Sequence, residues 1–310
     1  MTQTVAVIGA TGLQGGSVLH SLHATGKYKL VAVTRNTSSE SAKEIQTKYP
    51  DVELVAANLD DTESLKKAFN GADFVFGVTL FMQPDILSRI SAGDDDAEFY
   101  QGKNIADAAI AAGVKNIIFS TLYSIKDLSG GKYPGALHFE KKDKIEQYIR
   151  SKSSVIRSAF IQLGFYMDNF VNFSRISPED GKTVEFTFPL NPTTKLPLVD
   201  TAKDTGGVVA HIIDHFDDFV GKTVEVSGGY YEVQDMANTF TEVTGKPARF
   251  VQISYEALNN EDFEHMFKSY DEFGYFGWKT DFLDFNKKLS YTHTTPTEFW
   301  KNRGWTGPSQ

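Results

Sequence analysis

The sequence predicts an α/β protein: a doubly wound parallel sheet followed by a smaller α/β C-terminal lobe. Two observations predict this fold. Short runs rich in Val, Ile or Phe alternate with amphipathic stretches through the first half of the chain, as in repeated βαβ units. The rhythm breaks after about Arg157, and the proline-containing stretch Ser177 to Asp200 is expected to be loop-rich. We therefore expect a first domain over residues 1–157 and a smaller lobe over residues 158–310, interleaved as one compact unit.

The elements of the first domain follow from these patterns. The predicted strands are Val5 to Ile8, Leu30 to Thr34, Val52 to Ala56, Phe74 to Val78, Asn116 to Ser120 and Ser154 to Arg157. Thr62 to Phe69 is amphipathic and predicts a helix, and the alanine-rich run Asn104 to Gly113 predicts another that packs closely on the sheet. The three aspartates Asp94 to Asp96 are expected in a solvated loop that leads into this helix.

Fewer elements are predicted after Arg157. Helices are expected over Asp204 to Phe216 and Val233 to Thr244, with a strand over Thr223 to Ser227. The segment Met266 to Trp278 contains six aromatic residues within thirteen positions. Together with Gly164 to Phe170 it either lines an apolar pocket for a flat ligand or packs the second lobe. The residue pattern leaves both alternatives open.

Composition excludes several classes of protein. The chain has 310 residues, of which 41% are hydrophobic and 23% charged, as in ordinary soluble proteins. A net charge of -9 opposes direct binding to nucleic acids and to anionic membranes. The absence of cysteine excludes disulfides and zinc-thiolate sites, and we expect no metal. No leader or membrane-spanning run is recognised, so we expect a cytoplasmic protein, with the nucleus left open.

A glycine motif connects the first strand to the first helix. Gly9, Gly12 and Gly15 are spaced G-x-x-G-x-x-G. In a dinucleotide site these glycines serve a tight turn, the approach of the pyrophosphate to the backbone and the packing of the helix on the strand. The alternative is a glycine-rich turn without a ligand. We expect a dinucleotide site, because strand and helix patterns flank the motif on the correct sides.

Arg35 indicates which dinucleotide is bound. It follows the second strand, where NAD-specific sites place an acidic residue that accepts from the ribose 2′-hydroxyl. An arginine there suits a 2′-phosphate, so the sequence favours NADP(H). A solvated arginine without a ligand is the alternative.

With these motifs, the chain resembles the NmrA-like branch of the atypical short-chain dehydrogenase/reductase superfamily, which has a Rossmann-like domain. The resemblance rests on GATGLQGGSV, AVTRN, NLDDTESLKKAF, GVKNIIFST, HFEKKDKIEQYIR and GFYMDNF, and covers nearly the whole chain. It implies that NADP(H) is held by Thr11, Gly12, Leu13 and Gln14 around the phosphates, Arg35 at the 2′-phosphate, Asn58 and Leu59 at the adenine, Thr79 at the ribose, and Lys142 and Tyr166 on the nicotinamide side.

The resemblance also identifies the expected catalytic residues. Active members of the superfamily use Y-x-x-x-K on a helix, and here Lys142 is preceded four residues earlier by His138. Histidine is a competent acid or base near neutral pH, but the usual tyrosine is missing. Ser120 falls where active relatives bind the substrate oxygen. Both His138 and Ser120 also fit structural roles, packing at a helix start and ending a strand.

Two functions follow from this combination. In the first, the protein is a redox-sensing or regulatory NADP(H)-binding protein that acts through a protein partner. In the second, it is an NADPH-dependent reductase of a small apolar carbonyl substrate, such as a quinone or enone, with His138, Lys142 or water as proton donor.

Asn58 is a departure from the family pattern. The superfamily usually has an aspartate at this position, which accepts from the adenine amino group. The carbonyl oxygen of asparagine can still accept, so we expect the adenine contact to be weaker but not lost.

Overall fold

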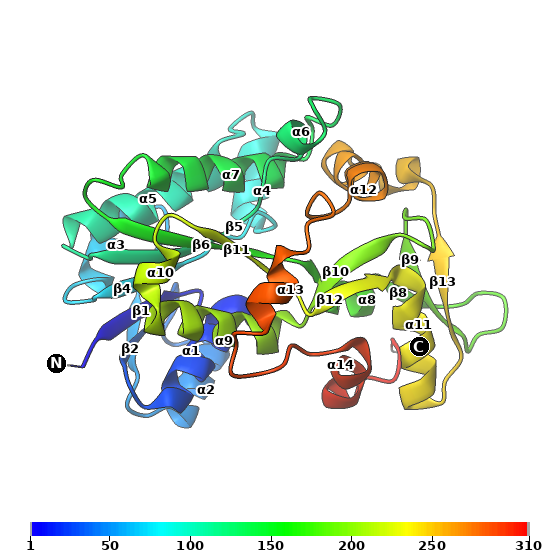
Figure 1. Ribbon diagram of the computed structural model, residues 1–310, viewed down its shortest axis with the longest axis horizontal. Helices are drawn as coiled ribbons and strands as arrows, with labels where there is room; N and C mark the ends of the chain where they lie inside the picture. Colours follow the sequence, from blue (N-terminus) through cyan, green and yellow to red (C-terminus); the bar gives the residue numbers. More distant parts are fainter. Residues whose placement is uncertain (1, 309–310) are drawn as a thin grey trace. The chain divides into compact units, whose positions relative to one another are not determined.

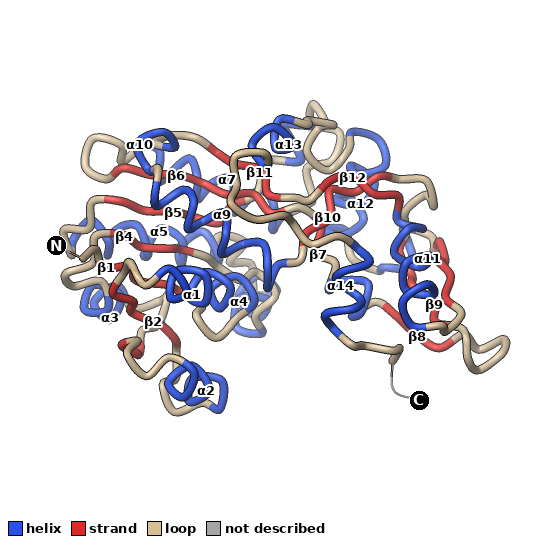
Figure 2. The backbone as a smooth tube through the Cα atoms, turned by 60° about the horizontal axis from the view of Figure 1, so that its bottom comes forward, coloured by secondary structure: helices blue, strands red, loops and turns tan. Residues whose placement is uncertain are grey.

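In the computed structural model, which describes residues 2–308, seven strands form one sheet (Figure 1). The strands are β1 (Thr4–Ile8), β2 (Lys29–Thr34), β3 (Glu53–Ala56), β4 (Phe74–Gly77), β5 (Asn116–Thr121), β6 (Arg157–Leu163) and β11 (Thr223–Val226). Their order is β11-β6-β5-β4-β1-β2-β3, and every pair from β3 to β6 is parallel. Figure 2 shows β6, β5, β4, β1 and β2 following one another across the sheet.

The strand order reverses beside β1. The chain runs from β1 outward through β2 and β3, and then returns to place β4 on the other side of β1. At such a reversal the loops after neighbouring strands diverge and leave room for a ligand outside the carboxyl ends of the strands. The ends of β1 and β4 are close here, because a Cβ added at Gly9 would lie 3.2 Å from Cγ1 of Val78.

Helices cover both faces of this sheet. On one face, α3 (Thr62–Ala68), α5 (Ala97–Ala111) and α7 (Leu137–Arg150) pack on a core that includes Ile8, Val75 and Phe119. The other face carries α1 (Leu13–Thr25), α9 (Thr201–Asp214) and α10 (Phe216–Phe219), and Figure 1 shows α5 and α7 opposite α1 and α9. The remaining helices of this region are α2 (Glu40–Lys48) and α4 (Pro84–Ser91).

A second group of elements forms two three-stranded sheets. The first sheet has the order β12-β10-β7, from β12 (Gly229–Glu232), β10 (Lys195–Val199) and β7 (Phe165–Tyr166). The second has the order β13-β9-β8, from β13 (Ala248–Gln252), β9 (Val184–Phe188) and β8 (Ser174–Ile176). The helices are α6 (Ile125–Leu128), α8 (Asp168–Asn172), α11 (Val233–Thr244), the 3-10 helix η1 (Tyr255–Leu258), α12 (Glu261–Phe273), α13 (Asp281–Asn286) and α14 (Pro296–Arg303).

The chain passes repeatedly between two compact units. The first unit comprises the residues up to Tyr123 together with His138–Gln162 and Thr205–Val224. The second unit comprises Ser124–Leu137, Leu163–Asp204 and the residues from Glu225 onward. The sequence predicts interleaved parts with a boundary at residue 157, but it does not locate the crossings, because that boundary follows the loss of a pattern along the chain and not contacts in space. The functions expected of the two parts remain predictions.

Two predicted elements need correction. Ser154 to Arg157 is not a strand: the turn after α7 extends through Val155, and β6 begins only at Arg157. The apolar residues that enter the sheet are those after Arg157, and six of the seven residues of β6 are buried. The stretch Ser177 to Asp200, expected to be loop-rich, also contains β9 and β10.

Candidate functional site

The turn after β1 holds the glycines of the predicted dinucleotide motif. Gly9 has a φ angle of 65°, in the left-handed region that favours glycine. A Cβ added at Gly15 would lie 2.3 Å from the carbonyl oxygen of Gly9, so only glycine lets α1 approach the turn this closely. Gly12 is the N-cap of α1 and provides no side-chain hydrogen bond. The side chain of this residue therefore does not cap the first N–H groups of the helix, which is the arrangement that anion sites at helix N-termini require.

The residues that follow the first glycine differ in exposure. Thr11 and Leu13 are exposed, whereas Gln14 is half-buried at the first turn of α1. Leu13 has 47% of its surface exposed. These positions form the rim of the turn, where a dinucleotide would contact backbone and apolar side chain together.

Arg35 lies directly after β2, at the same edge of the sheet. Its side chain is exposed, and Nη1 donates a hydrogen bond to Oε1 of Gln83 at 2.5 Å. Gln83 is the N-cap of α4 and makes no side-chain capping bond there. The guanidinium is therefore held by a neutral acceptor, which a phosphate can replace with a stronger, charge-assisted pair.

Asn58 and Leu59 lie in the loop after β3. Oδ1 of Asn58 accepts a hydrogen bond from the backbone N–H of Asp60 at 3.1 Å, and the carbonyl of Leu59 accepts one from Nδ2 of Asn104 at 2.9 Å. These bonds fix the loop conformation while the Asn58 side chain stays exposed. Because an amide oxygen has two lone pairs, Asn58 retains one acceptor position for a ligand amino group.

Lys142 and Thr79 are brought together at the end of β4. Nζ of Lys142 donates to the carbonyl oxygen and to Oγ1 of Thr79, both at 3.0 Å. The same ammonium donates to Oε1 of Glu98 and forms an ion pair with it. Thr79 Oγ1 in turn donates to this carboxylate oxygen at 2.8 Å. The Lys142 side chain is 14% exposed and that of Glu98 is fully buried.

Glu98 was not predicted as a site residue. It follows the aspartate run, which the sequence interpretation assigns to a solvated loop. That loop does lead into α5, but Asp94 pairs with Arg89 and Asp96 with Lys141 and Lys144. The hydrogen bond from Lys144, followed by that from Lys141, lowers the pKa of Asp96. A usable signal was the spacing of Glu98 four and seven residues before Gly102 and Ile105, which places it on the buried face of α5.

His138 and Ser120 lie in different surroundings. His138 is half-buried in the first turn of α7, and its ring centroid lies 5.5 Å from that of Phe81 and 4.8 Å from that of Phe139. It is four residues before Lys142, so the two share a helix face. Ser120 is buried near the end of β5, with 4% of its surface exposed. The catalytic roles of all three residues remain predictions.

Tyr166 and the aromatic segments belong to the second unit. Tyr166 is half-buried on β7 and pairs with Val199 of β10. In the segment Met266 to Trp278, Tyr270, Tyr275 and Phe276 are buried, whereas Trp278 is 48% exposed. The rings of this segment contact Phe165 and Phe188 in the core of the unit, and the hydroxyl of Tyr275 donates to the carbonyl of Leu163 at 2.9 Å. Most of these aromatics therefore have a packing role.

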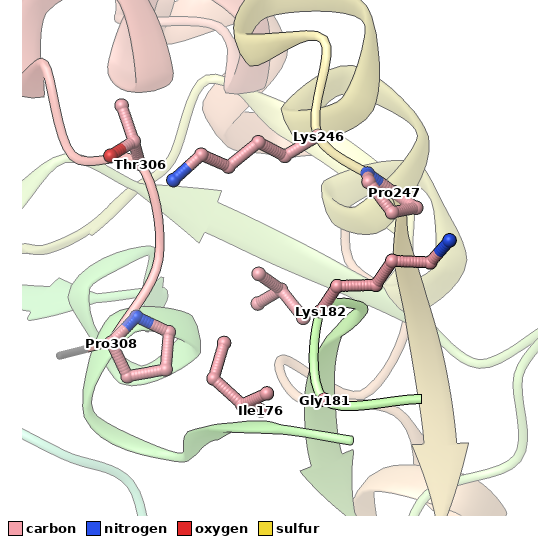
Figure 3. A pocket seen from close by; sticks show the side chains of 8 residues that line it. Ile176, Gly181, Lys182, Lys246, Pro247, Thr306 and Pro308 are labelled. Carbon is pink, nitrogen blue, oxygen red and sulfur yellow. The ribbon is translucent and has the colours of Figure 1, made fainter. Parts of the chain in front are cut away.

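A cavity of about 380 Å³ also lies in the second unit (Figure 3). It is lined by Ile176, Gly181, Lys182, Val184, Lys246, Pro247, Thr306 and Pro308, none of which is a predicted site residue. Figure 3 shows the side chain of Lys246 extending toward Thr306, while the Lys182 ammonium points away from it. Within residues 2–308, no cluster of three or more His, Asp or Glu side chains could hold a metal, and no helix has the length and apolar composition needed to cross a membrane.

Comparison with known proteins gives consistent results. The model of the NmrA-like family matches residues 1–306. An NmrA-like family domain-containing protein of Dictyostelium discoideum is 30% identical over 276 residues, covering 87% of this chain and 84% of the relative. An NmrA-like family domain-containing oxidoreductase of Penicillium ochrochloron is 28% identical over 291 residues, covering 85% and 82%.

Solved structures share the fold. The crystal structure of NmrA, a negative transcriptional regulator, in complex with NADP has a TM-score of 0.75 at 23% identity, covering 98% of this chain and 93% of NmrA. An NADPH-dependent quinone oxidoreductase of Escherichia coli, complexed with NADPH, has a TM-score of 0.73 at 21% identity, covering 97% and 99%. At these identities the likeness concerns the fold alone.

Proposed function

The chain belongs to the NmrA-like family, and from this premise we propose that its first unit binds NADP(H) and that the protein is a redox-sensing or regulatory cofactor-binding protein. The observation that carries the proposal is the turn after β1, where Gly15 leaves no room for a Cβ and Gly12 leaves α1 without a side-chain cap. This geometry fits a pyrophosphate placed against backbone N–H groups.

Arg35 selects the phosphorylated dinucleotide in this proposal. NmrA itself has been solved with NAD and with NADP, so the fold does not decide between them. The guanidinium of Arg35 is exposed and donates to the neutral amide of Gln83, so it is a fitting partner for a 2′-phosphate. We assign the pyrophosphate to Gly9, Thr11, Gly12, Leu13 and Gln14.

The other predicted residues complete the proposed site. Asn58 and Leu59 would flank the adenine, Thr79 would lie by the ribose, and Lys142 and Tyr166 would approach the nicotinamide side. When bound, NADP(H) supplies a hydride donor or acceptor. The Thr79 hydroxyl is engaged by Lys142 and Glu98, so a ribose hydroxyl would meet a prearranged group of polar atoms.

Sensing requires that NADPH and NADP+ stabilise different states of the protein. A ligand shifts a conformational equilibrium only by its differential affinity for the two states. We propose that this difference arises at the nicotinamide end, where the usual catalytic tyrosine is replaced by His138. The readout would be a protein partner, because the net charge of -9 opposes direct contact with DNA. We expect the protein in the cytoplasm, with a nuclear location left open.

A reductase of quinones, enones or other small carbonyl compounds is the second candidate. Lys142 favours it, because the ammonium is held at the end of β4 in a defined position. His138, Lys142 or water would supply the proton to the reduced carbonyl, and Ser120 would bind its oxygen. Several relatives are named oxidoreductases, which is consistent with this candidate.

One experiment tests both candidates. NADPH and NADH are titrated calorimetrically, and NADPH oxidation is then followed optically against a panel of quinones, enones and aldehydes. We expect tight NADPH binding, with NADPH at about 100 times its Kd raising the free energy of unfolding by about 2.7 kcal/mol. Failure to bind NADPH contradicts the whole proposal. Turnover that Lys142→Ala abolishes contradicts a purely sensing role, whereas tight binding with no turnover removes the support for a reductase.

A further inference from the structure

All three N–H groups of the Lys142 ammonium have a protein acceptor in this structure, so a ribose hydroxyl would bind by replacing one of the two Thr79 acceptors. A lysine ammonium has three N–H donors. The three are directed to the carbonyl of Thr79, to the hydroxyl of Thr79 and to Oε1 of Glu98. Two of these acceptors belong to Thr79, directly after β4. The third belongs to Glu98, which lies on α5.

Glu98 is unusual among the buried charges of the first unit. Its side chain has no exposed surface, and its second carboxylate oxygen, Oε2, is buried with no hydrogen-bond partner. Burying a carboxylate with one oxygen unpaired is costly, and an apolar residue would join α5 to α7 at lower cost. A glutamate at this position is therefore poorly explained by packing alone.

Glu146 provides the contrast within the same unit. It is also a buried glutamate in an ion pair, with Arg150 at 2.7 Å. Both of its oxygens are engaged: Thr121 donates to Oε2 at 2.6 Å, and Thr223 donates to Oε1 at 2.8 Å. This residue joins α7 to β5 and β11, as a structural ion pair does. In Glu98, by contrast, Oε2 has no hydrogen-bond partner, and Oε1 accepts from both Lys142 and Thr79.

We infer that Glu98 is a positioning residue: it fixes the Lys142 ammonium at the end of β4, where the ammonium meets the nicotinamide ribose of NADP(H). The inference rests on the proposed function. A lysine side chain has considerable rotamer freedom, which two acceptors on one residue restrict only in part. The Glu98 carboxylate adds a charged acceptor on another helix, so the ammonium is held before a cofactor arrives and less entropy is lost on binding.

The test separates the two halves of the cofactor. The full-length chain is titrated calorimetrically with NADPH and with adenosine 2′,5′-bisphosphate, which contains the 2′-phosphate but no nicotinamide ribose. For Glu98→Gln we expect NADPH affinity to fall about tenfold, while affinity for the bisphosphate stays within about twofold of the native value. Lys142→Met should show the same pattern, and Glu98→Gln combined with Lys142→Met should bind NADPH no more weakly than Lys142→Met alone.

Matched variants distinguish positioning from stability. Glu146→Gln should lower the melting temperature and leave both affinities within about twofold, because its contacts lie away from Thr79. If Glu98→Gln fails to fold, Glu98→Asp keeps the charge but withdraws it from Lys142, and the double variant leaves no unpaired buried charge. Either variant should show a selective loss of affinity for NADPH.

The outcomes remain separable from those of the proposed function. Failure of the native chain to bind NADPH refutes the proposed function and the inference with it. If Lys142→Met weakens NADPH binding and Glu98→Gln does not, the inference alone is overturned. The inference is also overturned if Glu98→Gln lowers the affinities for NADPH and for the bisphosphate equally, because that pattern indicates general damage to the unit.

Discussion

Arg35 illustrates how one exposed side chain can determine ligand choice. It contacts the neutral amide of Gln83, and a phosphate would form a charge-assisted and bidentate pair in its place. An aspartate at this position would repel the 2′-phosphate and accept hydrogen bonds from the hydroxyls of an unmodified ribose.

We therefore expect Arg35→Asp to abolish the preference for NADPH over NADH. The ratio of the two dissociation constants, measured by calorimetry, should change by about a hundredfold or more. This change corresponds to the loss of two charge-assisted hydrogen bonds worth about 1.5 kcal/mol each. Lys48→Asp, which makes the same charge change on α2, should leave the ratio unaltered. A preference that survives Arg35→Asp contradicts the role assigned to this residue.

Asp200, in the second unit, makes stability depend on pH. It is 6% exposed, and burial, followed by the charges of Asp204 and Asp168, raises its pKa to about 6. In the unfolded chain an aspartate has a pKa of about 3.9. Because the folded pKa is raised, the contribution of Asp200 to stability is fully present below about pH 4 and is lost as the pH rises through 6.

Asp200→Asn should consequently stabilise the protein above pH 7. The amide cannot ionise, and its oxygen can still accept from the backbone N–H groups of Ala202 and Lys203. The gain in unfolding free energy should reach up to about 3 kcal/mol at pH 8 and vanish near pH 4, as measured by urea unfolding at both pH values. Asp180→Asn is the control, because the Thr183 hydrogen bonds lower the pKa of Asp180 to about 2, so no gain is expected at pH 8. A pH-independent difference between native and Asp200→Asn would refute the assignment.

At the scale of elements, glycine permits the close approach of α9 to α1. A Cβ added at Gly206 would lie 2.0 Å from the carbonyl oxygen of Ser17, and the Gly206 N–H donates to Ser17 Oγ at 2.9 Å. At Gly102 of α5 the added Cβ would instead meet the side chain of Ile145, 2.4 Å from its Cδ1. Backbone cannot move aside as a side-chain end can.

Gly206→Ala should therefore cost about 3 kcal/mol of unfolding free energy, although alanine favours helix formation. Gly102→Ala should cost about 2 kcal/mol, because the buried Ile145 would have to shift, but a side chain moves more readily than the backbone. Urea unfolding of the two variants gives the comparison. A smaller cost for Gly206→Ala than for Gly102→Ala would contradict the close contact between the helices.

The strands show how far sequence patterns predict elements. β1 to β5 agree with the predicted runs to within one residue at their ends. β1, β2, β4 and β5 are almost entirely buried, and such strands are short apolar runs that are easy to recognise. α11 also has the predicted bounds, Val233–Thr244. β6 was misplaced because its apolar run starts after an arginine. In the second unit, β7, β8 and β12 were missed because they have only two to four residues, and β10 because it contains Pro197.

The candidate site was predictable only where the motif is local. The glycines and Arg35 follow from their positions after β1 and β2, which neighbouring residues define. The resemblance supplied Thr79 and Lys142, and the structure places them in contact. Glu98 and Gln83 were not predicted, because their significance lies in contacts with Lys142 and Arg35, 44 and 48 residues away along the chain. No pattern in a single sequence records such pairs.

At the scale of the whole molecule, the first unit depends on late parts of the chain. β5 pairs on one side with β4 and on the other with β6, and β11 lies beyond β6 at the edge of the sheet. Glu146 of α7 accepts a hydrogen bond from Thr223 of β11, and Arg150 donates to Thr223 and to the carbonyl of Gly221. The sheet that would bind the dinucleotide is therefore completed from residues beyond 157.

A chain that ends at Arg157 should therefore not fold, although it contains every motif proposed to bind the dinucleotide's phosphates and adenine. Without β6, the fully buried β5 becomes an exposed apolar edge, which promotes aggregation. Without Thr223, the buried carboxylate of Glu146 loses the hydrogen bond that the Thr223 hydroxyl donates to it. We expect this fragment to elute as an aggregate in size-exclusion chromatography and to lack the native far-UV circular dichroism. It should bind NADPH at least about a hundredfold more weakly than the full chain, because unfolding the unit removes several kcal/mol of binding energy. A monomeric fragment with native NADPH affinity would show that β6 and β11 are dispensable and that the boundary at residue 157 marks an independent domain.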